Sequence, residues 1–276
     1  MQDKKWQCRV APSLGDLEST HERVWGTEPY SNDERPTVFM GLYGLPDFYA
    51  LWRHKGEKHI LWCGSDITHF NNGYWLEEGG GIRIDRYDLA KWINKYCTNW
   101  CENDVEARKL SDCGIYAMVQ PSFLGDIENF PISFKPGNKV YASVSGNNFQ
   151  LYGWDKINDL AIANPLVEFH LYGNTVEWKT SSDNIIVHGR MPKEQMNAEI
   201  AEMQGGLRMV EFDGFSEVLA KSVLMGQWPV SIISYPHILK PHELSKILKK
   251  TEPNFEGREH YRQILNDYPW NCKKSH

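Results

Sequence analysis

Three charged side chains recur at intervals of four residues in the segment EFDGFSEVLAKSVLMGQWPVSII: Asp213, Glu217 and Lys221. If a helix begins in this segment, its first turn presents unpaired backbone N–H groups and a partial positive charge, which suit a diphosphate. The acids can accept hydrogen bonds from ribose or sugar hydroxyls. Ordinary capping explains the same residues, with Ser216 or Asp213 as N-cap and Glu217 favourable to the helix dipole. The segment by itself leaves both interpretations open.

Alternating strands and helices would position this segment. Residues 37–44 form a short apolar run that ends in glycine and predicts a buried strand. Residues 45–56 predict a helix, with Pro46 early and Gly56 at the end, and residues 58–67 predict a second strand. This βαβ unit implies a parallel sheet. Further helices are expected at 88–100 and 102–115, and a further strand at 116–122.

A Pro/Gly-rich stretch, residues 133–138, is interpreted as a linker, after which the alternation resumes. Two such arrays predict an α/β protein with two doubly wound, Rossmann-like domains facing a cleft. In such sheets, ligands bind beyond the carboxyl ends of the strands. In the second array we expect strands at 166–174, 184–191 and 229–233, a strand that leads into a loop at 139–147, and a short strand or extended segment at 206–212. Helices are expected at 153–165, 192–203 and about 216–225.

Composition argues against several classes of protein. The 276 residues are 41% hydrophobic and 24% charged, as in soluble globular proteins. The longest apolar runs fall short of the roughly 18 residues of a membrane span, and MQDKKWQCRV lacks the apolar core of a secretory signal. We therefore expect a cytoplasmic protein with no membrane partner. Six irregularly spaced cysteines are typical of reduced thiols, and Cys97, Cys101 and Cys113 match no standard zinc spacing.

The charge distribution bears on possible polyanionic partners. A net charge of −6 argues against an extended nucleic-acid surface. Basic residues nevertheless gather in residues 240–276 and in residues 53–59. These clusters are compatible with a polyanionic partner, and they are also explained as charged helix faces exposed to solvent. No G-x-G-x-x-G motif follows an expected strand, which argues against a nicotinamide-dependent oxidoreductase.

Residues 213–230 resemble the signature of the retaining GT-B glycosyltransferases, E-G-F-G-x-x-x-x-E-A-M-A-x-G-x-P-V. The sequence DGFS corresponds to E-G-F-G, and Gly226, Pro229 and Val230 correspond to G-x-P-V with one extra residue between them. NIIVHGRMPKEQM resembles the strand and turn that precede this motif in the same enzymes. In the first half, CGSDI resembles the family's H-G-S-D-I strand end. The matching segments are spread over roughly residues 37–235.

This resemblance implies a GT-B fold and a metal-independent, retaining transfer from a nucleotide sugar. The nucleotide sugar, expected to be UDP-linked, is a co-substrate, and no other cofactor is implied. Residues 1–135 would form the acceptor-side domain and residues 136–235 the nucleotide-sugar-binding domain. Residues 236–276 would form a helical segment that crosses back to the first domain. The sequence contains no D-x-D motif, which argues against the metal-dependent GT-A transferases.

Three positions depart from the family pattern. Asp213 replaces the first glutamate, Lys221 replaces the second, and Cys63 replaces the histidine of H-G-S-D. In the family these acids hold the nucleotide sugar, so the departures bear on the donor and on activity. We expect Glu217, four residues after Asp213, to take over from the missing acid, because residues i and i+4 share a helix face. Lys221 would then stand near the diphosphate.

The resemblance also implies roles for individual residues. Asp213 and Glu217 would face the sugar or ribose as catalytic residues. Asp66 is expected near the acceptor hydroxyl, with a structural cap as its equal alternative. The other donor contacts are expected from Ser145, Gly146, Asn147, Arg190, Gly214, Phe215, Ser216 and Lys221. The acceptor contacts are expected from Tyr43, Asp47, Arg53 and Trp75.

A narrower resemblance concerns the acceptor. GLYGLPDFYALWRHKG, SFLGDI and DGFSEVLAKSVLMGQWPV are similar to compact glycosyltransferases that phages encode beside TET-like dioxygenases. This similarity implies 5-hydroxymethylcytosine in phage DNA as acceptor, hydroxymethylated DNA as partner and the host cytoplasm as location. Aromatic side chains stack on sugar faces and on unstacked bases alike, so the eleven Trp and thirteen Tyr do not decide. A glycan or small-molecule acceptor stays open, as does a non-catalytic GT-B-like protein that binds a nucleotide or glycan.

Overall fold

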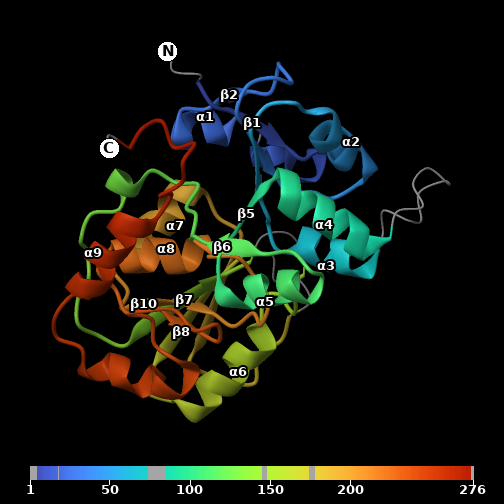
Figure 1. The fold of residues 1–276 in the computed structure, drawn as a ribbon. Helices are drawn as coiled ribbons and strands as arrows, with labels where there is room; N and C mark the ends of the chain where they lie inside the picture. Colours follow the sequence, from blue (N-terminus) through green and yellow to red (C-terminus); the bar gives the residue numbers. More distant parts are fainter. Residues whose placement is uncertain (1–4, 18, 74–84, 145–147, 174–177, 275–276) are drawn as a thin grey trace. The chain divides into compact units, whose positions relative to one another are not determined.

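The computed structural model describes residues 5–17, 19–73, 85–144, 148–173 and 178–274 (Figure 1). The chain forms two compact units, which we describe separately. Unit 1 comprises Met1–Leu124, Phe212–Phe215 and Ile264–His276. Unit 2 comprises Gly125–Glu211 and Ser216–Gln263. The chain thus first leaves unit 1 after Leu124, whereas the linker was expected at residues 133–138.

Unit 1 is built on a parallel sheet with strand order β2-β1-β3-β4-β5-β6. The order changes direction between β1 and β3, which is the arrangement of a doubly wound sheet. The strands are β1 (Gln7–Val10), β2 (Glu28–Pro29), β3 (Thr37–Met40), β4 (Lys58–Leu61), β5 (Thr98–Cys101) and β6 (Ala117–Val119). The helices are α1 (Thr20–Trp25), α2 (Leu45–Arg53), α3 (Ser65–Asn72), α4 (Arg86–Tyr96) and α5 (Asp104–Asp112), with a 3-10 helix over Pro12–Leu17.

The expected βαβ unit is confirmed, because β3 pairs in parallel with β4 across α2. The helix expected over 88–100 is wrong in its last part. Helix α4 ends at Tyr96, and the next residues form β5 between β4 and β6. Asn99 and Cys101 are buried on one face of β5, while the Trp100 indole N–H donates to His59 Nδ1 at 3.0 Å. These contacts from neighbouring elements favour a strand where the local pattern predicts a continued helix.

The end of the chain packs in unit 1. Trp270 is fully buried and meets Trp25 edge to face, with ring centroids 6.0 Å apart. The backbone N–H of Cys272 donates to the carbonyl of Trp25 at 2.8 Å. Tyr268 stacks on Trp270 at 4.4 Å and donates its hydroxyl to the carbonyl of Gln120. This aromatic cluster joins the last residues of the chain to the first helix.

Unit 2 has a second parallel sheet, with strand order β11-β10-β7-β8-β9. The central strand is β7, with β8 and β9 on one side of it and β10 and β11 on the other, so the order reverses between β7 and β10. The α/β class and the doubly wound sheets are therefore confirmed. The strands are β7 (Lys139–Ser143), β8 (Glu168–Tyr172), β9 (Ile185–Gly189), β10 (Gly205–Arg208) and β11 (Val230–Ser231). The helices are α6 (Trp154–Ala163), α7 (Lys193–Ile200), α8 (Glu217–Leu224) and α9 (Phe255–Ile264), with 3-10 helices over Ile127–Asn129 and Pro241–Lys249.

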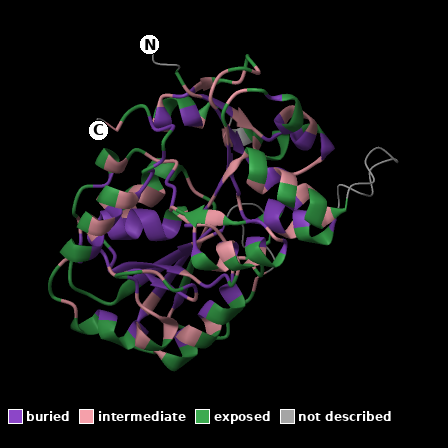
Figure 2. Cartoon of the chain, viewed as in Figure 1, coloured by how far each residue is buried: buried purple, intermediate pink, exposed green. Residues whose placement is uncertain are grey.

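Helix α8 is the buried helix of unit 2. After its first residue, Glu217, every residue of the helix is buried (Figure 2). A Cβ at Gly206 of β10 would lie 2.7 Å from Val218 Cγ1, so only glycine lets the helix approach the strand this closely. The backbone N–H of Gly206 donates to Ser222 Oγ at 2.9 Å, which fixes the helix along the strand. Among the described residues, no helix has the length and apolar character needed to cross a bilayer.

Replacing Ser222 tests this attachment. Ser222→Ala leaves the buried N–H of Gly206 without its acceptor, which costs about 1–3 kcal/mol. We expect the free energy of unfolding to fall by that amount in urea denaturation followed by circular dichroism. Ser111→Ala, at an exposed position of α5, is the control and should change stability by about 0.5 kcal/mol or less. Equal stability of both variants would contradict a role for this hydrogen bond.

Candidate functional site

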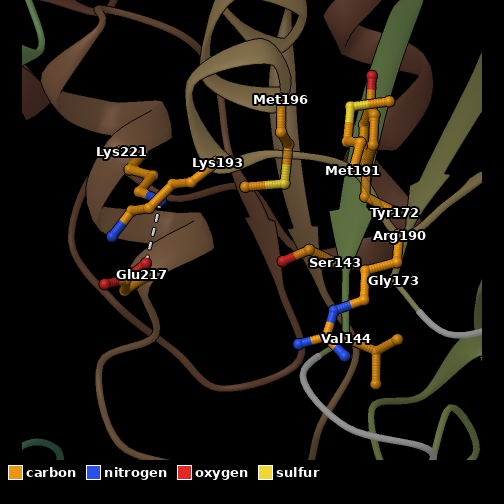
Figure 3. A pocket seen from close by; sticks show the side chains of 10 residues that line it. All are labelled: Ser143, Val144, Tyr172, Gly173, Arg190, Met191, Lys193, Met196, Glu217 and Lys221. Carbon is orange, nitrogen blue, oxygen red and sulfur yellow. Dashed lines mark ion pairs between the residues drawn. The ribbon is translucent and has the colours of Figure 1, made fainter. Parts of the chain in front are cut away.

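A cavity of about 380 Å³ opens in unit 2 at the carboxyl ends of β7, β8 and β9 (Figure 3). Helices α7 and α8 supply the rest of its wall. This is the edge at which doubly wound sheets bind their ligands, because the helices that follow the strands begin there. The cavity is lined by Ser143, Val144, Tyr172, Gly173, Arg190, Met191, Lys193, Met196, Glu217 and Lys221.

Three cations line the cavity: Lys193 and Lys221 lie together, and Arg190 lies across from them in Figure 3. Lys221 is a buried residue of α8, and its Nζ lies 3.0 Å from Glu217 Oε2. Lys193 at the start of α7 reaches toward the same pair (Figure 3). Arg190 follows β9 and is exposed; its guanidinium pairs with no group of the described chain. Three cations against one carboxylate leave an excess of positive charge in the cavity, which favours an anionic ligand.

Apolar and aromatic residues also line the cavity. Tyr172, at the end of β8, Met191, after β9, and Val144 lie on the same side of Figure 3 as Arg190. Gly173 has φ +122°, and a Cβ there would lie 2.4 Å from Val144 Cγ1, so this turn requires glycine. A ligand with an anionic part and a flat, weakly polar part would match this lining of the cavity.

A hydrogen-bonded network holds the Tyr172 wall. The Tyr172 hydroxyl donates to Glu199 Oε2 of α7 at 2.9 Å, and the ring of His188 stacks on Tyr172 with centroids 4.5 Å apart. His188 Nε2 lies 2.8 Å from His170 Nδ1, and His170 Nε2 lies 2.6 Å from Glu168 Oε1. Burial lowers the pKa of His170 more than Glu168 raises it, so this imidazole tends to be neutral. The network orients the aromatic ring that faces the cavity.

The residues predicted for the donor divide into three groups. Arg190, Glu217 and Lys221 line the cavity together, as expected for one site. Glu217 and Lys221 share a helix face, but Asp213 precedes α8, so the expected four-residue spacing along a helix is wrong for Asp213 and Glu217. Asp213, Gly214 and Phe215 belong to unit 1, and Ser216 is the N-cap of α8 with Oγ 3.4 Å from the N–H of Leu219. Ser145, Gly146 and Asn147 lie outside the described residues.

The residues predicted for the acceptor do not form one exposed cluster. Asp47 is buried, accepts the N–H groups of Tyr43 and Gly44, and pairs with Arg9 at 2.7 Å. The Tyr43 hydroxyl donates to the carbonyl of Cys63 at 3.2 Å. Arg53 is exposed, with its guanidinium 5.9 Å from the Tyr49 ring centroid. Trp75 lies outside the described residues. Asp47 thus acts as a helix cap in this structure, and its contact with an acceptor stays a prediction.

Asp66 likewise acts as a helix cap. It is fully buried at the start of α3 and accepts the N–H groups of Leu42, Cys63 and Ile67 at 2.8–3.0 Å. These are the contacts of the structural alternative stated for this residue, and its role beside an acceptor stays a prediction. Burial raises the pKa of Asp66 to about 7, despite the three hydrogen bonds that lower it.

Two further acids of unit 1, one half-buried and one fully buried, escaped the sequence analysis. Glu102 follows β5, and Glu106 lies in α5 with no exposed surface. Glu106 Oε2 accepts the backbone N–H of Glu102 at 2.8 Å. Burial raises the pKa of Glu102 to about 7, and burial and then the Glu102 charge raise the pKa of Glu106. The sequence shows only two acids at a helix start, and their burial depends on the strands and turns around them.

The raised pKa values predict how stability depends on pH. The folded protein holds the Asp66 proton more tightly than the unfolded chain, whose pKa is near 3.8. This contribution to stability is therefore full below pH 3.8 and is lost as the pH rises toward 7, by up to about 1.4 kcal/mol per pH unit. Asp66→Asn cannot titrate, so the difference in unfolding free energy between wild type and variant should change across pH 4–7. The control is Glu34→Gln, at an exposed position of unit 1, whose unfolding free energy should differ from that of wild type by the same amount across this pH range. A constant difference for Asp66→Asn would contradict the raised pKa of Asp66.

Among the described residues, no group of three or more His, Cys, Asp or Glu side chains is placed to hold a metal ion. No protein-family model matches the sequence, and no curated protein matches it in sequence. Its fold is similar to several solved structures. S. aureus TarM in complex with fondaparinux, α-GlcNAc-glycerol and UDP is 14% identical at a TM-score of 0.53, over 91% of this chain and 55% of TarM.

Two further structures support the same fold. Sucrose-phosphate synthase from Thermosynechococcus elongatus is 10% identical at a TM-score of 0.57, over 92% of this chain and 74% of the synthase. The lipopolysaccharide outer core galactosyltransferase WaaB is 9% identical at a TM-score of 0.55, over 95% of each chain. The chain spans little more than half of TarM but nearly all of WaaB. The two Rossmann-like sheets are therefore those of the GT-B fold.

Proposed function

We propose that this protein is a glycosyltransferase that takes a sugar from a nucleotide sugar bound in the cavity of unit 2. The observation that carries the proposal is that Arg190, Lys193 and Lys221 line one cavity at the carboxyl ends of the strands. A nucleoside diphosphate sugar has the anionic part and the flat base that the lining of this cavity would accommodate. The UDP present in the TarM complex supports a UDP-linked donor.

The chemistry follows from where charge develops. When the bond from the sugar to the diphosphate breaks, negative charge grows on the departing phosphate oxygen. Lys221, which is buried and paired with Glu217, and the exposed Lys193 and Arg190 would stabilise that charge without a metal ion, because cations that line the same cavity act at short range. Glu217 pairs with Lys221 and would direct the ammonium group toward the phosphates, or accept a hydrogen bond from a ribose or sugar hydroxyl.

The remaining donor and acceptor roles are part of the proposal. Asp213 would meet the sugar from the turn before α8, and the backbone N–H groups of Gly214 and Ser216 would face the diphosphate, whereas the N–H of Phe215 donates to Glu102 Oε2 at 3.0 Å. A retaining outcome rests on the resemblance of the signature alone. Unit 1 would supply the acceptor surface. The alternative without transfer, a protein that only binds a nucleotide or glycan, would use the same cavity.

The acceptor has two candidate classes. The sequence resemblance favours 5-hydroxymethylcytosine in DNA. The names of WaaB and of sucrose-phosphate synthase refer to carbohydrate products, and the TarM complex contains α-GlcNAc-glycerol, which favours a glycan or polyol.

Substitutions of the cavity cations test the donor site. Arg190→Ala should weaken UDP binding by about 1.5–3 kcal/mol, the worth of a charge-assisted hydrogen bond, with little effect on folding. Lys221→Glu should weaken binding more than Lys221→Ala, because it places a carboxylate beside the diphosphate. Isothermal titration calorimetry with UDP measures both effects. Lys179→Ala, an exposed cation of unit 2 outside the cavity, should bind UDP like wild type. Unchanged affinity in the Arg190 and Lys221 variants would remove this cavity as the donor site.

A transfer assay separates the acceptor classes. Wild-type protein incubated with UDP-sugars in EDTA should transfer sugar to one acceptor, read by mass spectrometry, from a panel of hydroxymethylated DNA, glycans and glycerol. Transfer to DNA should weaken steeply with added salt, because DNA binding releases counterions. Salt-independent transfer to a glycan or polyol would decide against DNA. Hydrolysis without transfer, or UDP binding without either, would favour the non-catalytic alternative or a different acceptor class.

A further inference from the structure

We propose that Glu102 is a positioning residue for the transfer reaction, because its carboxylate holds the Asp213–Phe215 turn that precedes α8. The inference rests on the proposed function and adds to it a residue from a distant part of the sequence. Glu102 follows the last residue of β5, in unit 1, and the turn belongs to the same unit. The two segments are therefore described relative to each other within one compact body.

The carboxylate of Glu102 binds the turn directly. Its Oε2 accepts the backbone N–H of Phe215 at 3.0 Å. Its Oε1 accepts the backbone N–H of Ser122 at 3.1 Å and the hydroxyl of the same serine. All three partners donate, so they match an ionised carboxylate, which only accepts. A carboxamide would turn its NH₂ group toward at least one donor and lose that hydrogen bond.

Gly214 leaves the space that this contact needs. A Cβ at Gly214 would lie 1.8 Å from Glu102 Oε2, closer than any side chain allows. The residue after Glu102 adds a second contact, because Asn103 Nδ2 donates to the carbonyl of Asp213 at 2.6 Å. Asn103 is itself fixed as the N-cap of α5 through Val105 and Glu106. Two consecutive residues after β5 thus hold both ends of the turn.

The acids around Glu102 make this contact sensitive to ionisation. Glu106 from α5, Asp66 from α3 and Asp213 from the turn itself contribute negative charge to the same group of residues, and Tyr268 from the C-terminal segment feels the charge of Glu102. Protonation of Glu102 would convert one acceptor oxygen into a donor and release a partner. Glu106 Oε1 is buried and has no hydrogen-bond partner among the described residues, so it takes no part in holding the turn.

Glu102 should affect turnover and UDP affinity differently. Ser216, directly after the turn, caps α8, but the helix is fixed along β10 by Ser222 within unit 2. Loosening the turn should therefore displace Asp213 more than Lys221 and Glu217. We expect the step that uses Asp213 to slow, while UDP still binds in the cavity.

The experiment compares Glu102→Gln with wild type and with Glu34→Gln, an exposed acid of unit 1. Glu102→Gln should lower kcat for sugar transfer or donor hydrolysis at least tenfold, with UDP affinity changed less than twofold. The wild-type kcat should rise with pH as Glu102 ionises, and this limb should be absent in Glu102→Gln. Hydrogen exchange at the Phe215 amide should be faster in this variant. Glu34→Gln should match wild type in all four measurements.

A double substitution guards against a simple loss of folding. In a protein that keeps Glu102, Gly214→Ala should lower kcat strongly, because the new Cβ clashes with the carboxylate. In a protein that already carries Glu102→Ala, the same substitution should lower kcat little further, because the carboxylate is absent. Additive effects would overturn the inference, as would a normal kcat in Glu102→Gln together with faster exchange at Phe215. If wild type neither binds UDP nor turns over any nucleotide sugar, the proposed function is wrong, and the catalytic part of this inference falls with it. Faster Phe215 exchange would then support only the structural contact.

Discussion

The close packing of α8 on β10 is the constraint on which the candidate site depends. There is no room for a side chain between Gly206 and Val218, and Ser222 sets the position of the helix along the strand. Because the sheet order reverses between β7 and β10, a helix in this place begins beside the carboxyl ends of the central strands. Its first and fifth residues, Glu217 and Lys221, therefore face the cavity, while the rest of the helix is available to the core.

The cavity is also shaped by residues that never touch a ligand. Tyr172 belongs to the cavity wall, is 1% exposed, and is held by Glu199 and by the stacked ring of His188. Such support restricts side-chain rotation, so that less conformational entropy is lost when a ligand binds. The cations differ in restraint. Lys221 is buried and paired with Glu217, whereas Lys193 and Arg190 are exposed and can adjust to the geometry of an anionic group.

The sequence predicted best where short apolar runs end in Gly or Pro. Strands β7, β8 and β9 fall in expected segments for this reason, and β10 begins one residue before its expected segment. Arg190, Glu217 and Lys221 line one cavity, and their contact with a donor stays a prediction. Prediction from the sequence failed where an element is determined by contacts between residues far apart along the chain. Strand β5 follows a helical pattern without a breaking residue, and its pairing depends on distant strands. The burial of Glu102 and the network behind Tyr172 are equally invisible in the sequence, because each contact joins residues far apart along the chain.

The division of the chain has a consequence for how such a protein can change over evolution. The backbone passes between the units after residues 124, 211, 215 and 263, so neither unit is a continuous stretch of sequence. A fragment ending at Leu124 would lack Trp270 and expose the aromatic cluster around Trp25 to water. An exchange of unit 1 between genes would therefore have to carry both ends of the chain and the Phe212–Phe215 segment together.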